Sequence, residues 1–272
     1  MNADLELSGA TRLVGIVGDP IAQVKSPAGV TRRLRARGID AVCVPFHVAS
    51  ADFAAVMGAL AATRNIDGMI VTVPHKFAAL PLCASASERA RFTGAANVLR
   101  RNPDRSWHGD MLDGLGFAAA QRDAGARLDG ARALLAGAGG AGSAIALGLL
   151  EAGVAHLAVH DADPARRDAL IARLAERFPG RVGAGSADPA GVDVVANATP
   201  MGMRAGDPYP VAVERLAARM HVGDVVTVPE VPPLLVAARQ AGCSIQTGTG
   251  MFARVLDLMI DFFDPAPAAA RG

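Results

Sequence analysis

The sequence predicts an α/β protein with two domains, each built on a mainly parallel sheet. Short apolar runs alternate with helical patterns along most of the chain, which is typical of parallel strands joined by crossover helices. Hydrophobic residues make up 51% of the 272 residues and aromatic residues only 4%. The core must therefore consist largely of aliphatic side chains, which suit a sheet covered by helices.

The first α/β series occupies the N-terminal part of the chain. Its expected elements are a strand at 13–17, a helix at 27–37, a strand at 41–48, a helix at 52–62, a strand at 68–73 and a polar hairpin turn at 100–107. Glycine and proline punctuate these boundaries, at Gly18, Gly38 and Pro74. The arginines of the first helix, at 32, 33, 35 and 37, are expected to form a solvated face.

A second α/β series begins near residue 131. Its expected elements are strands at 131–136, 156–160, 192–196, 222–228 and 243–246, and helices at 143–151, 164–177, 233–241 and 251–263. Pro164 suits the first turn of its helix, with Asp163 as the N-cap. Apolar residues at helical spacing give the last helix one apolar face. Two such series suggest two domains with a ligand between them.

A glycine-rich turn is the most informative motif of the second series. Gly137, Ala138, Gly139, Gly140, Ala141 and Gly142 follow an apolar run and open a helix of small residues. Gly137 would allow a tight turn, Gly139 would let the backbone approach a pyrophosphate, and Gly142 would let the helix pack close to the strand. Asp161 ends the next apolar run, where an acidic residue can bind ribose hydroxyls. Together these features predict a Rossmann-type dinucleotide-binding domain.

Composition argues against several other functions. The chain has 27 Lys and Arg against 26 Asp and Glu, so nothing indicates a nucleic-acid partner. Its three cysteines and six histidines show neither a disulfide framework nor metal-ligand spacing, and we expect no metal. No apolar run is long enough to span a bilayer, and the first residues lack a signal sequence. We therefore expect a cytoplasmic protein with no membrane partner.

The N-terminal series should supply the proton donor or acceptor that a nicotinamide enzyme needs at the substrate oxygen. Lys76 follows the end of an expected strand and Pro74, and ligands bind at the carboxyl ends of strands in open α/β sheets. Asp113 is a candidate partner that would orient Lys76. On its own, Lys76 is better explained as an exposed lysine, and only a match to a known fold would favour a catalytic role. His75 is a rival general base.

Several segments, in order along nearly the whole chain, together resemble the shikimate/quinate dehydrogenase family. They are Gly15 to Ile21 with Lys25-Ser26-Pro27, Val71 to Lys76, Gly94 to Asn97, Asp113-Gly114, Gly137 to Gly142, Asn197 to Met203 and Gly248 to Met251. The Thr-x-Pro-x-Lys and Asn-x-Thr-Pro-x-Gly-Met patterns are the most specific.

The resemblance implies a fold, an activity and a set of site residues. Residues 1–112 and 250–272 would form an α/β substrate-binding domain, and 113–249 the Rossmann domain. The activity would be reversible oxidation of a ring hydroxyl of shikimate or quinate, as in the shikimate pathway, by a monomer or homodimer. Lys76 and Asp113 would be catalytic. The implied substrate-binding residues are Ser26, Thr72, Asn97, Thr227 and Met251. The implied cofactor-binding residues are Gly137, Ala138, Gly139, Gly140, Ala141, Gly142, Asp161, Arg166, Asn197, Ala198, Thr199, Pro200, Met201 and Gly250.

The sequence departs from the family at five positions that usually line the site. They are Val24, Ile70, Met111, Thr227 and Val255. Most of these changes remove a hydrogen-bonding group, and an unpaired polar group costs roughly 1–3 kcal/mol. A different substrate, less polar or amino-substituted, is therefore an alternative. A second alternative is an NAD-binding sensor with little catalysis, although a sensor would not need Lys76 and Asp113.

The choice of cofactor rests on the segment after the second strand of the Rossmann series. NADP-dependent relatives carry Asn-Arg-Thr there, and this chain carries Asp161-Ala162-Asp163. The charge of Asp161 should repel a 2′-phosphate, although Arg166 could compensate in part. The sequence therefore predicts NAD over NADP.

Overall fold

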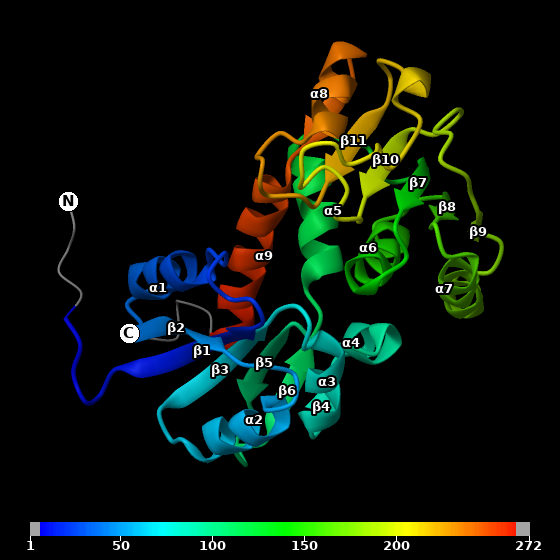
Figure 1. Ribbon diagram of the computed structural model, residues 1–272. Helices are drawn as coiled ribbons and strands as arrows, with labels where there is room; N and C mark the ends of the chain where they lie inside the picture. Colours follow the sequence, from blue (N-terminus) through cyan, green and yellow to red (C-terminus); the bar gives the residue numbers. More distant parts are fainter. Residues whose placement is uncertain (1–5, 265–272) are drawn as a thin grey trace. The chain divides into compact units, whose positions relative to one another are not determined.

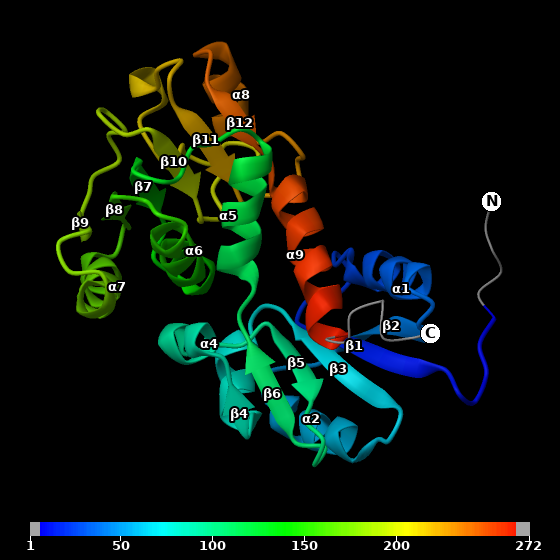
Figure 2. The ribbon, with the colours of Figure 1, turned by 180° about the vertical axis from the view of Figure 1, so that it is seen from behind.

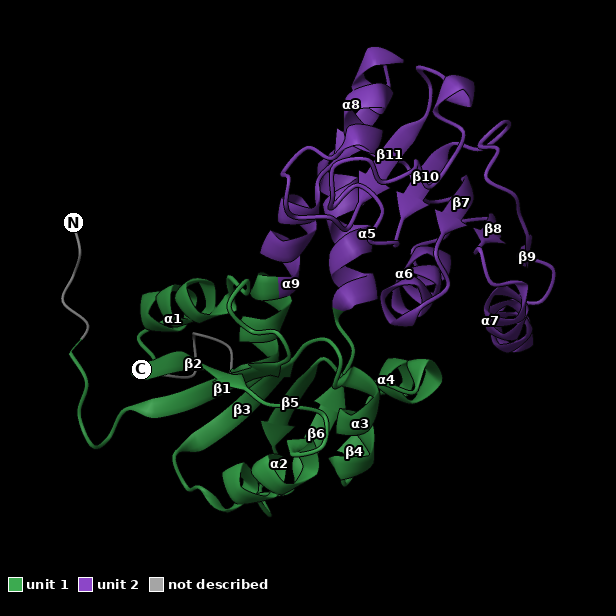
Figure 3. Cartoon of the chain, viewed as in Figure 1, with its two compact units in different colours: residues 1–112, 256–272 green, residues 113–255 purple. Residues whose placement is uncertain are grey.

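The computed structural model describes residues 6–264 and divides the chain into two compact units (Figures 1, 2 and 3). Unit 1 comprises residues 1–112 and 256–272, and unit 2 comprises residues 113–255. The second division falls within helix α9 (Gly248–Phe263), the helix that also contains the boundary expected at 249/250. The expected outer ends of the first domain, 1–5 and 265–272, lie outside the described residues.

Unit 1 contains a six-stranded sheet in the order β2-β1-β3-β5-β6-β4. Its strands are β1 (Arg12–Gly18), β2 (Ala41–His47), β3 (Ile66–Val71), β4 (Ser85–Ala86), β5 (Val98–Arg101) and β6 (Trp107–Asp110). Strand β1 pairs in parallel with β2 and β3, while β5 is antiparallel to β3 and β6. The antiparallel pair β5–β6 confirms the hairpin predicted from the polar segment at 100–107.

Helices cover both faces of this sheet. They are α1 (Ser26–Ala36), α2 (Phe53–Ala62), the short α3 (Lys76–Ala79) with the 3-10 turn η1 (Leu80–Leu82), and α4 (Glu88–Thr93). Helix α1 lies on one face and α2 on the other (Figure 1), as right-handed crossovers in both directions from β1 require. The arginines of α1 are exposed or half-buried, which agrees with the expected solvated face. Arg33 and Arg37 pair with Asp257 and Asp261 of α9, at 2.8 and 2.5 Å.

Unit 2 contains a six-stranded, entirely parallel sheet in the order β12-β11-β10-β7-β8-β9. Its strands are β7 (Arg132–Ala136), β8 (His156–His160), β9 (Val182–Ala184), β10 (Val194–Asn197), β11 (His221–Asp224) and β12 (Ser244–Gln246). This is the doubly wound order, and its direction reverses between β7 and β10. Ligands of such sheets bind at the carboxyl ends of the strands at that reversal.

The helices of unit 2 are α5 (Asp113–Asp123), α6 (Gly140–Glu151), α7 (Pro164–Arg177) and α8 (Pro233–Gln240), with the 3-10 turn η2 (Val213–Arg215). Asp163 caps α7 as predicted, because its side chain accepts hydrogen bonds from Ala165 and Arg166. Helices α5 and α6 lie side by side (Figures 1 and 2). A side chain on Gly114 would strike the Ala144 carbonyl, so glycine permits this close approach. Within residues 6–264, no helix has the length and apolar character needed to cross a membrane.

Candidate active site

The glycine turn links β7 to α6 at the reversal point of the unit 2 sheet. Gly137 has a φ of +100°, a left-handed conformation that favours glycine. A Cβ on Gly142 would collide with the Gly137 carbonyl, whereas a Cβ on Gly139 would meet no atom within 4 Å. Packing within the protein therefore requires glycine at 137 and 142, while the backbone of Gly139 is open. That open backbone beside the N-terminus of α6 fits the approach of a dinucleotide pyrophosphate.

Asp161, at the end of β8, turns its carboxylate toward this glycine turn. The carboxylate accepts hydrogen bonds from the Ala138 N–H at 2.7 Å and the Asp163 N–H at 2.8 Å. Burial opposes its ionisation, but these two bonds and the charges of Arg166 and His160 outweigh burial, so the pKa of Asp161 is lowered. The guanidinium of Arg166 lies 3.8 Å from Asp161 and 3.6 Å from Asp163. Asp161 thus holds the turn together, and a cation lies beside it.

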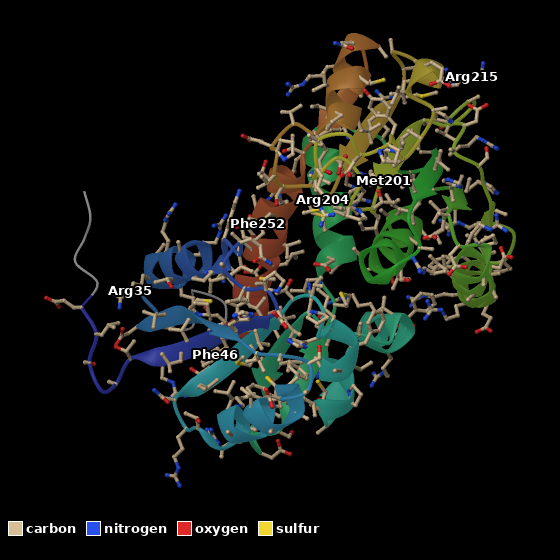
Figure 4. The ribbon with its side chains drawn as sticks, viewed as in Figure 1. Arg35, Phe46, Met201, Arg204, Arg215 and Phe252 are labelled. Carbon is tan, nitrogen blue, oxygen red and sulfur yellow. The ribbon has the colours of Figure 1, made fainter. Side chains whose placement is uncertain are left out.

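The segment 197–201 follows β10 and packs on the same turn. A Cβ on Gly137 would contact both Ala198 and Thr199. The Asn197 side-chain oxygen accepts hydrogen bonds from the Thr199 N–H at 3.0 Å and the Thr199 hydroxyl at 2.6 Å. Met201 and Arg204 follow in the loop after β10 (Figure 4). The glycine turn, Asp161 and the 197–201 segment are therefore brought together at one end of the unit 2 sheet.

Lys76, Thr72 and Asn97 are brought together in unit 1, at the carboxyl end of β3. Thr72 follows that strand, and its N–H donates to the Val17 carbonyl of β1 at 3.0 Å. Lys76 opens α3, and its carbonyl accepts from the N–H of Ala96 at 2.9 Å. Asn97 is next in the chain and is buried, with its side-chain oxygen accepting the Leu112 N–H at 2.9 Å. The backbones of the three residues are therefore held close together at the carboxyl end of the sheet, where ligands of open α/β sheets bind.

His75, the rival general base, belongs to the core of unit 1. It is 2% exposed, and its ring stacks on Phe53 with centroids 4.5 Å apart. Its Nε2 lies 2.8 Å from the Val48 carbonyl oxygen and must carry the proton there, since a carbonyl only accepts. These contacts give His75 a structural role and leave Lys76 as the stronger candidate.

The remaining predicted site residues lie at element ends. Ser26 begins α1 and is buried in unit 1. In unit 2, Asp113 begins α5 and is 8% exposed, Thr227 follows β11, and Gly250 and Met251 lie in the first turn of α9. The structure therefore places the predicted catalytic pair in different units, Lys76 in unit 1 and Asp113 in unit 2.

At three of the positions where this chain differs from the family, an apolar side chain is packed into the interior of its unit. Ile70, Met111 and Val255 are between 2% and 4% exposed. Val255 packs directly on Gly116, where an added Cβ would strike it. Val24 and Thr227 are half-buried, so these two retain access to the surface of their own units.

Sequence reasoning missed Asp224, a buried carboxylate at the end of β11. Its Oδ2 accepts a hydrogen bond from the Asn197 amide at 3.1 Å, and its Oδ1 accepts the Val226 N–H at 2.8 Å. Burial raises the pKa of Asp224 to about 6, against three hydrogen bonds that lower it. The available signal was a single ionisable residue in a largely apolar expected strand.

Comparisons with known proteins agree with this architecture. Residues 16–99 match the model of the shikimate dehydrogenase substrate binding domain. A shikimate dehydrogenase (NADP(+)) of Rubrobacter xylanophilus is 38% identical over 248 residues, covering 89% of this chain and 87% of the relative. A structure of quinate dehydrogenase from Corynebacterium glutamicum with NAD is 29% identical, with a TM-score of 0.85 and 96% of each chain covered. The 5-ketofructose reductase of a Gluconobacter strain is 28% identical, with a TM-score of 0.86 and 95% of each chain covered.

The relatives overturn the prediction of NAD as cofactor. The Rubrobacter protein and other curated relatives are named as NADP(+)-dependent. The prediction assumed that the charge of Asp161 faces the ribose and repels a 2′-phosphate. In the structure that carboxylate accepts two backbone N–H groups, and the Arg166 guanidinium lies next to it. Its negative charge is therefore partly compensated.

The likeness extends over both units. The substrate-domain match falls in unit 1, and the similarity to the Rubrobacter protein continues through most of unit 2, since it covers 89% of the chain. The likeness to the solved quinate dehydrogenase structure covers 96% of this chain and therefore also reaches both units. The chain therefore belongs to the shikimate/quinate dehydrogenase family, whose members are oxidoreductases that act on CH–OH groups.

Proposed function

We propose that this protein is an NADP(H)-dependent dehydrogenase that interconverts a ring hydroxyl and a ketone of a cyclic hydroxy acid, shikimate or quinate. The observation that carries the proposal is the open backbone of Gly139 at the reversal point of the unit 2 sheet. Bound there, the dinucleotide would supply a nicotinamide that accepts the hydride from the carbinol carbon. The protein must then bind the substrate and move one proton.

Lys76 and Asp113 are the proposed proton-transfer pair. The neutral Lys76 amine would take the hydroxyl proton as the ketone forms, and Asp113 would hold the resulting ammonium in place. Ser26, Thr72 and Asn97 would bind the substrate's carboxylate and other hydroxyls, with Thr227 and Met251 bordering the ring. Supporting this assignment, Thr72, Lys76 and Asn97 lie together at the end of β3 and its neighbours.

The remaining site residues would bind the dinucleotide. The 137–142 turn would bind the pyrophosphate through backbone N–H groups at the start of α6. Arg166, whose side chain is 55% exposed beside Asp161, would bind the 2′-phosphate. The segment from Asn197 to Met201, together with Gly250, would border the nicotinamide.

A different cyclic or polyol substrate is the second candidate. The chain has Val24 and Thr227 where the family usually has hydrogen-bonding groups, and both are half-buried. A 5-ketofructose reductase has the same fold at 28% identity. The lost hydroxyl at Val24 and the shorter side chain of Thr227, where the family usually has tyrosine, would favour a substrate with fewer or differently placed hydroxyls.

The test is steady-state kinetics with NADP+ on shikimate, quinate and a panel of cyclic and open-chain polyols. Lys76→Met should lower kcat by about 100-fold or more while NADPH binding persists, because general acid–base groups contribute on that scale. Arg32→Met, at an exposed position on α1, is the control for loss of a positive charge. Turnover that survives Lys76→Met would refute the proton-transfer role. Tight NADPH binding without turnover of any substrate would instead indicate a sensor.

A further inference from the structure

Asn197 and Asp224 form a buried pair at the carboxyl ends of neighbouring parallel strands. They are register partners in the β10–β11 ladder, and both side chains are fully buried. The Asn197 side-chain nitrogen donates to Asp224 Oδ2 at 3.1 Å. This end of the ladder lies where the chain leaves the sheet for segment 197–201 on one strand and 225–227 on the other.

The carboxylate of Asp224 determines which way the Asn197 amide faces. An ionised carboxylate only accepts hydrogen bonds, so the Asn197 NH2 group must point toward it. The Asn197 carbonyl oxygen then points away and accepts both the N–H and the hydroxyl of Thr199. The Thr199 hydroxyl in turn accepts the Met201 N–H at 3.2 Å.

The second oxygen of Asp224 holds the segment that follows β11. Oδ1 accepts the Val226 N–H at 2.8 Å. The start of α9 packs on this segment, because a Cβ on Gly248 would strike the carbonyls of Val225 and Val226. One buried side chain therefore ties together the ends of two strands and, through them, the 197–201 segment and the first turn of α9.

We propose that Asp224 is a positioning residue that sets the place of segments 197–201 and 225–227. It would place the first by fixing the orientation of the Asn197 amide and the second by accepting the Val226 N–H. This inference rests on the proposed function, since that function assigns both segments to the ligand. Asp224 touches neither substrate nor cofactor in this proposal. It acts through Asn197 on one side and through Val226 on the other.

Asp224→Asn is the most specific test because it preserves the shape of the side chain and replaces one acceptor oxygen with an NH2 donor. The oxygen of the introduced amide could keep the Val226 N–H, but its NH2 group would then face the NH2 group of Asn197. We expect kcat to fall about tenfold and KM for NADP(H) to rise, because a buried unmatched donor carries a penalty of that size. Affinity for adenosine 2′,5′-bisphosphate, which lacks the nicotinamide, should stay unchanged.

Two further variants separate positioning from folding. The exchange Asn197→Asp with Asp224→Asn restores one donor facing one acceptor but removes the bond from the Asn197 amide to the Met201 carbonyl at 3.4 Å. It should therefore recover part of the kcat, even if Asp224→Asn alone folds poorly. Asp193→Asn is the matched control. Asp193 precedes β10 at its opposite end, is exposed, and also accepts a backbone N–H, from Arg132 at 2.9 Å. It should leave kcat and KM as they are.

The outcomes distinguish this inference from the proposed function. Wild-type turnover with NADP+ and unaltered kinetics in Asp224→Asn would overturn only the positioning role. A parallel loss of adenosine 2′,5′-bisphosphate binding, or an exchange variant that recovers no activity, would also overturn it. A wild-type protein that neither binds NADPH nor reduces NADP+ would remove the proposed function and this inference together.

Discussion

The Asp161 carboxylate accepts a hydrogen bond from the Ala138 backbone N–H at 2.7 Å, which ties the end of β8 to the glycine turn. An acidic residue at this place is usually interpreted through its reach to a ribose hydroxyl. In this chain the same carboxylate also accepts the Asp163 N–H, so it shapes the turn from within. The distinction matters because it changes what a substitution at Asp161 should do.

Asp161→Asn should weaken binding of NADP(H) and NAD(H) to the same extent. The amide retains one acceptor oxygen, so one of the two backbone N–H groups loses its partner. KM for both dinucleotides should rise by up to about tenfold, the cost of leaving the buried Ala138 N–H unsatisfied. The check is to measure both cofactors side by side, with exposed Asp168→Asn as the control. A selective gain for NADP would show that charge repulsion, and not the turn, is the main contribution of Asp161.

Arg166→Gln should weaken NADP(H) binding and leave NAD(H) binding unchanged. Arg166 is the basic residue beside Asp161 and Asp163 in the first turn of α7, and a charge-assisted bond to a phosphate is worth about tenfold or more in affinity. Arg167→Gln is the matched control, because Arg167 is the next residue and pairs with Asp168 at 2.7 Å. Equal losses for the two cofactors would place the 2′-phosphate elsewhere.

Elements with a clear local pattern were predicted closely from the sequence. Strand β8 and helix α7 have the bounds that their patterns indicated. Helix α5 was not predicted, because glycines and small residues buried on several sides give it no one-sided apolar face. Strand β11 was expected to reach residue 228 but ends at Asp224, whose own side chain takes the Val226 N–H.

Some site residues could be predicted from local sequence and others could not. Lys76 and the glycine turn belong to short sequence motifs next to expected strands, which is why the sequence pointed to them. The contacts of Asp161 with Ala138 and of Asp224 with Asn197 join residues 23 and 27 positions apart. Neither contact has a local signature, because each depends on which strands become neighbours in the sheet.

Gly148→Ala should destabilise unit 2 by about 1–3 kcal/mol, the range for overpacking a close contact. Helix α6 crosses α5 at this point, and an added Cβ would strike the backbone of Gly114. Gly58→Ala is the control, since Gly58 lies in helix α2 and a Cβ there would meet no atom within 4 Å. The control should gain about 0.5–1 kcal/mol from helix propensity. Urea unfolding of both variants checks the pair, and equal changes would contradict close packing of α5 on α6.

The pH dependence of stability should show two opposing contributions from one strand. Burial raises the pKa of Asp224 to about 6, and burial lowers the pKa of His221 to about 4. Between these values the folded state holds an extra proton on Asp224, so its contribution to the free energy of unfolding falls as pH rises. The unfolded state holds the extra proton on His221, so the contribution of His221 rises with pH over the same range.

Removing either titrating group should therefore leave the pH dependence that the other group contributes to the free energy of unfolding. Asp224→Asn should make the free energy of unfolding rise more steeply between pH 4 and 6 than in the wild type, and His221→Gln should make it rise less or fall. The double variant should regain the wild-type slope, whatever its absolute stability. Urea unfolding at a series of pH values measures these slopes, with Asp193→Asn as a surface control. Wild-type slopes in both single variants would mean that neither group titrates differently in the folded and unfolded states.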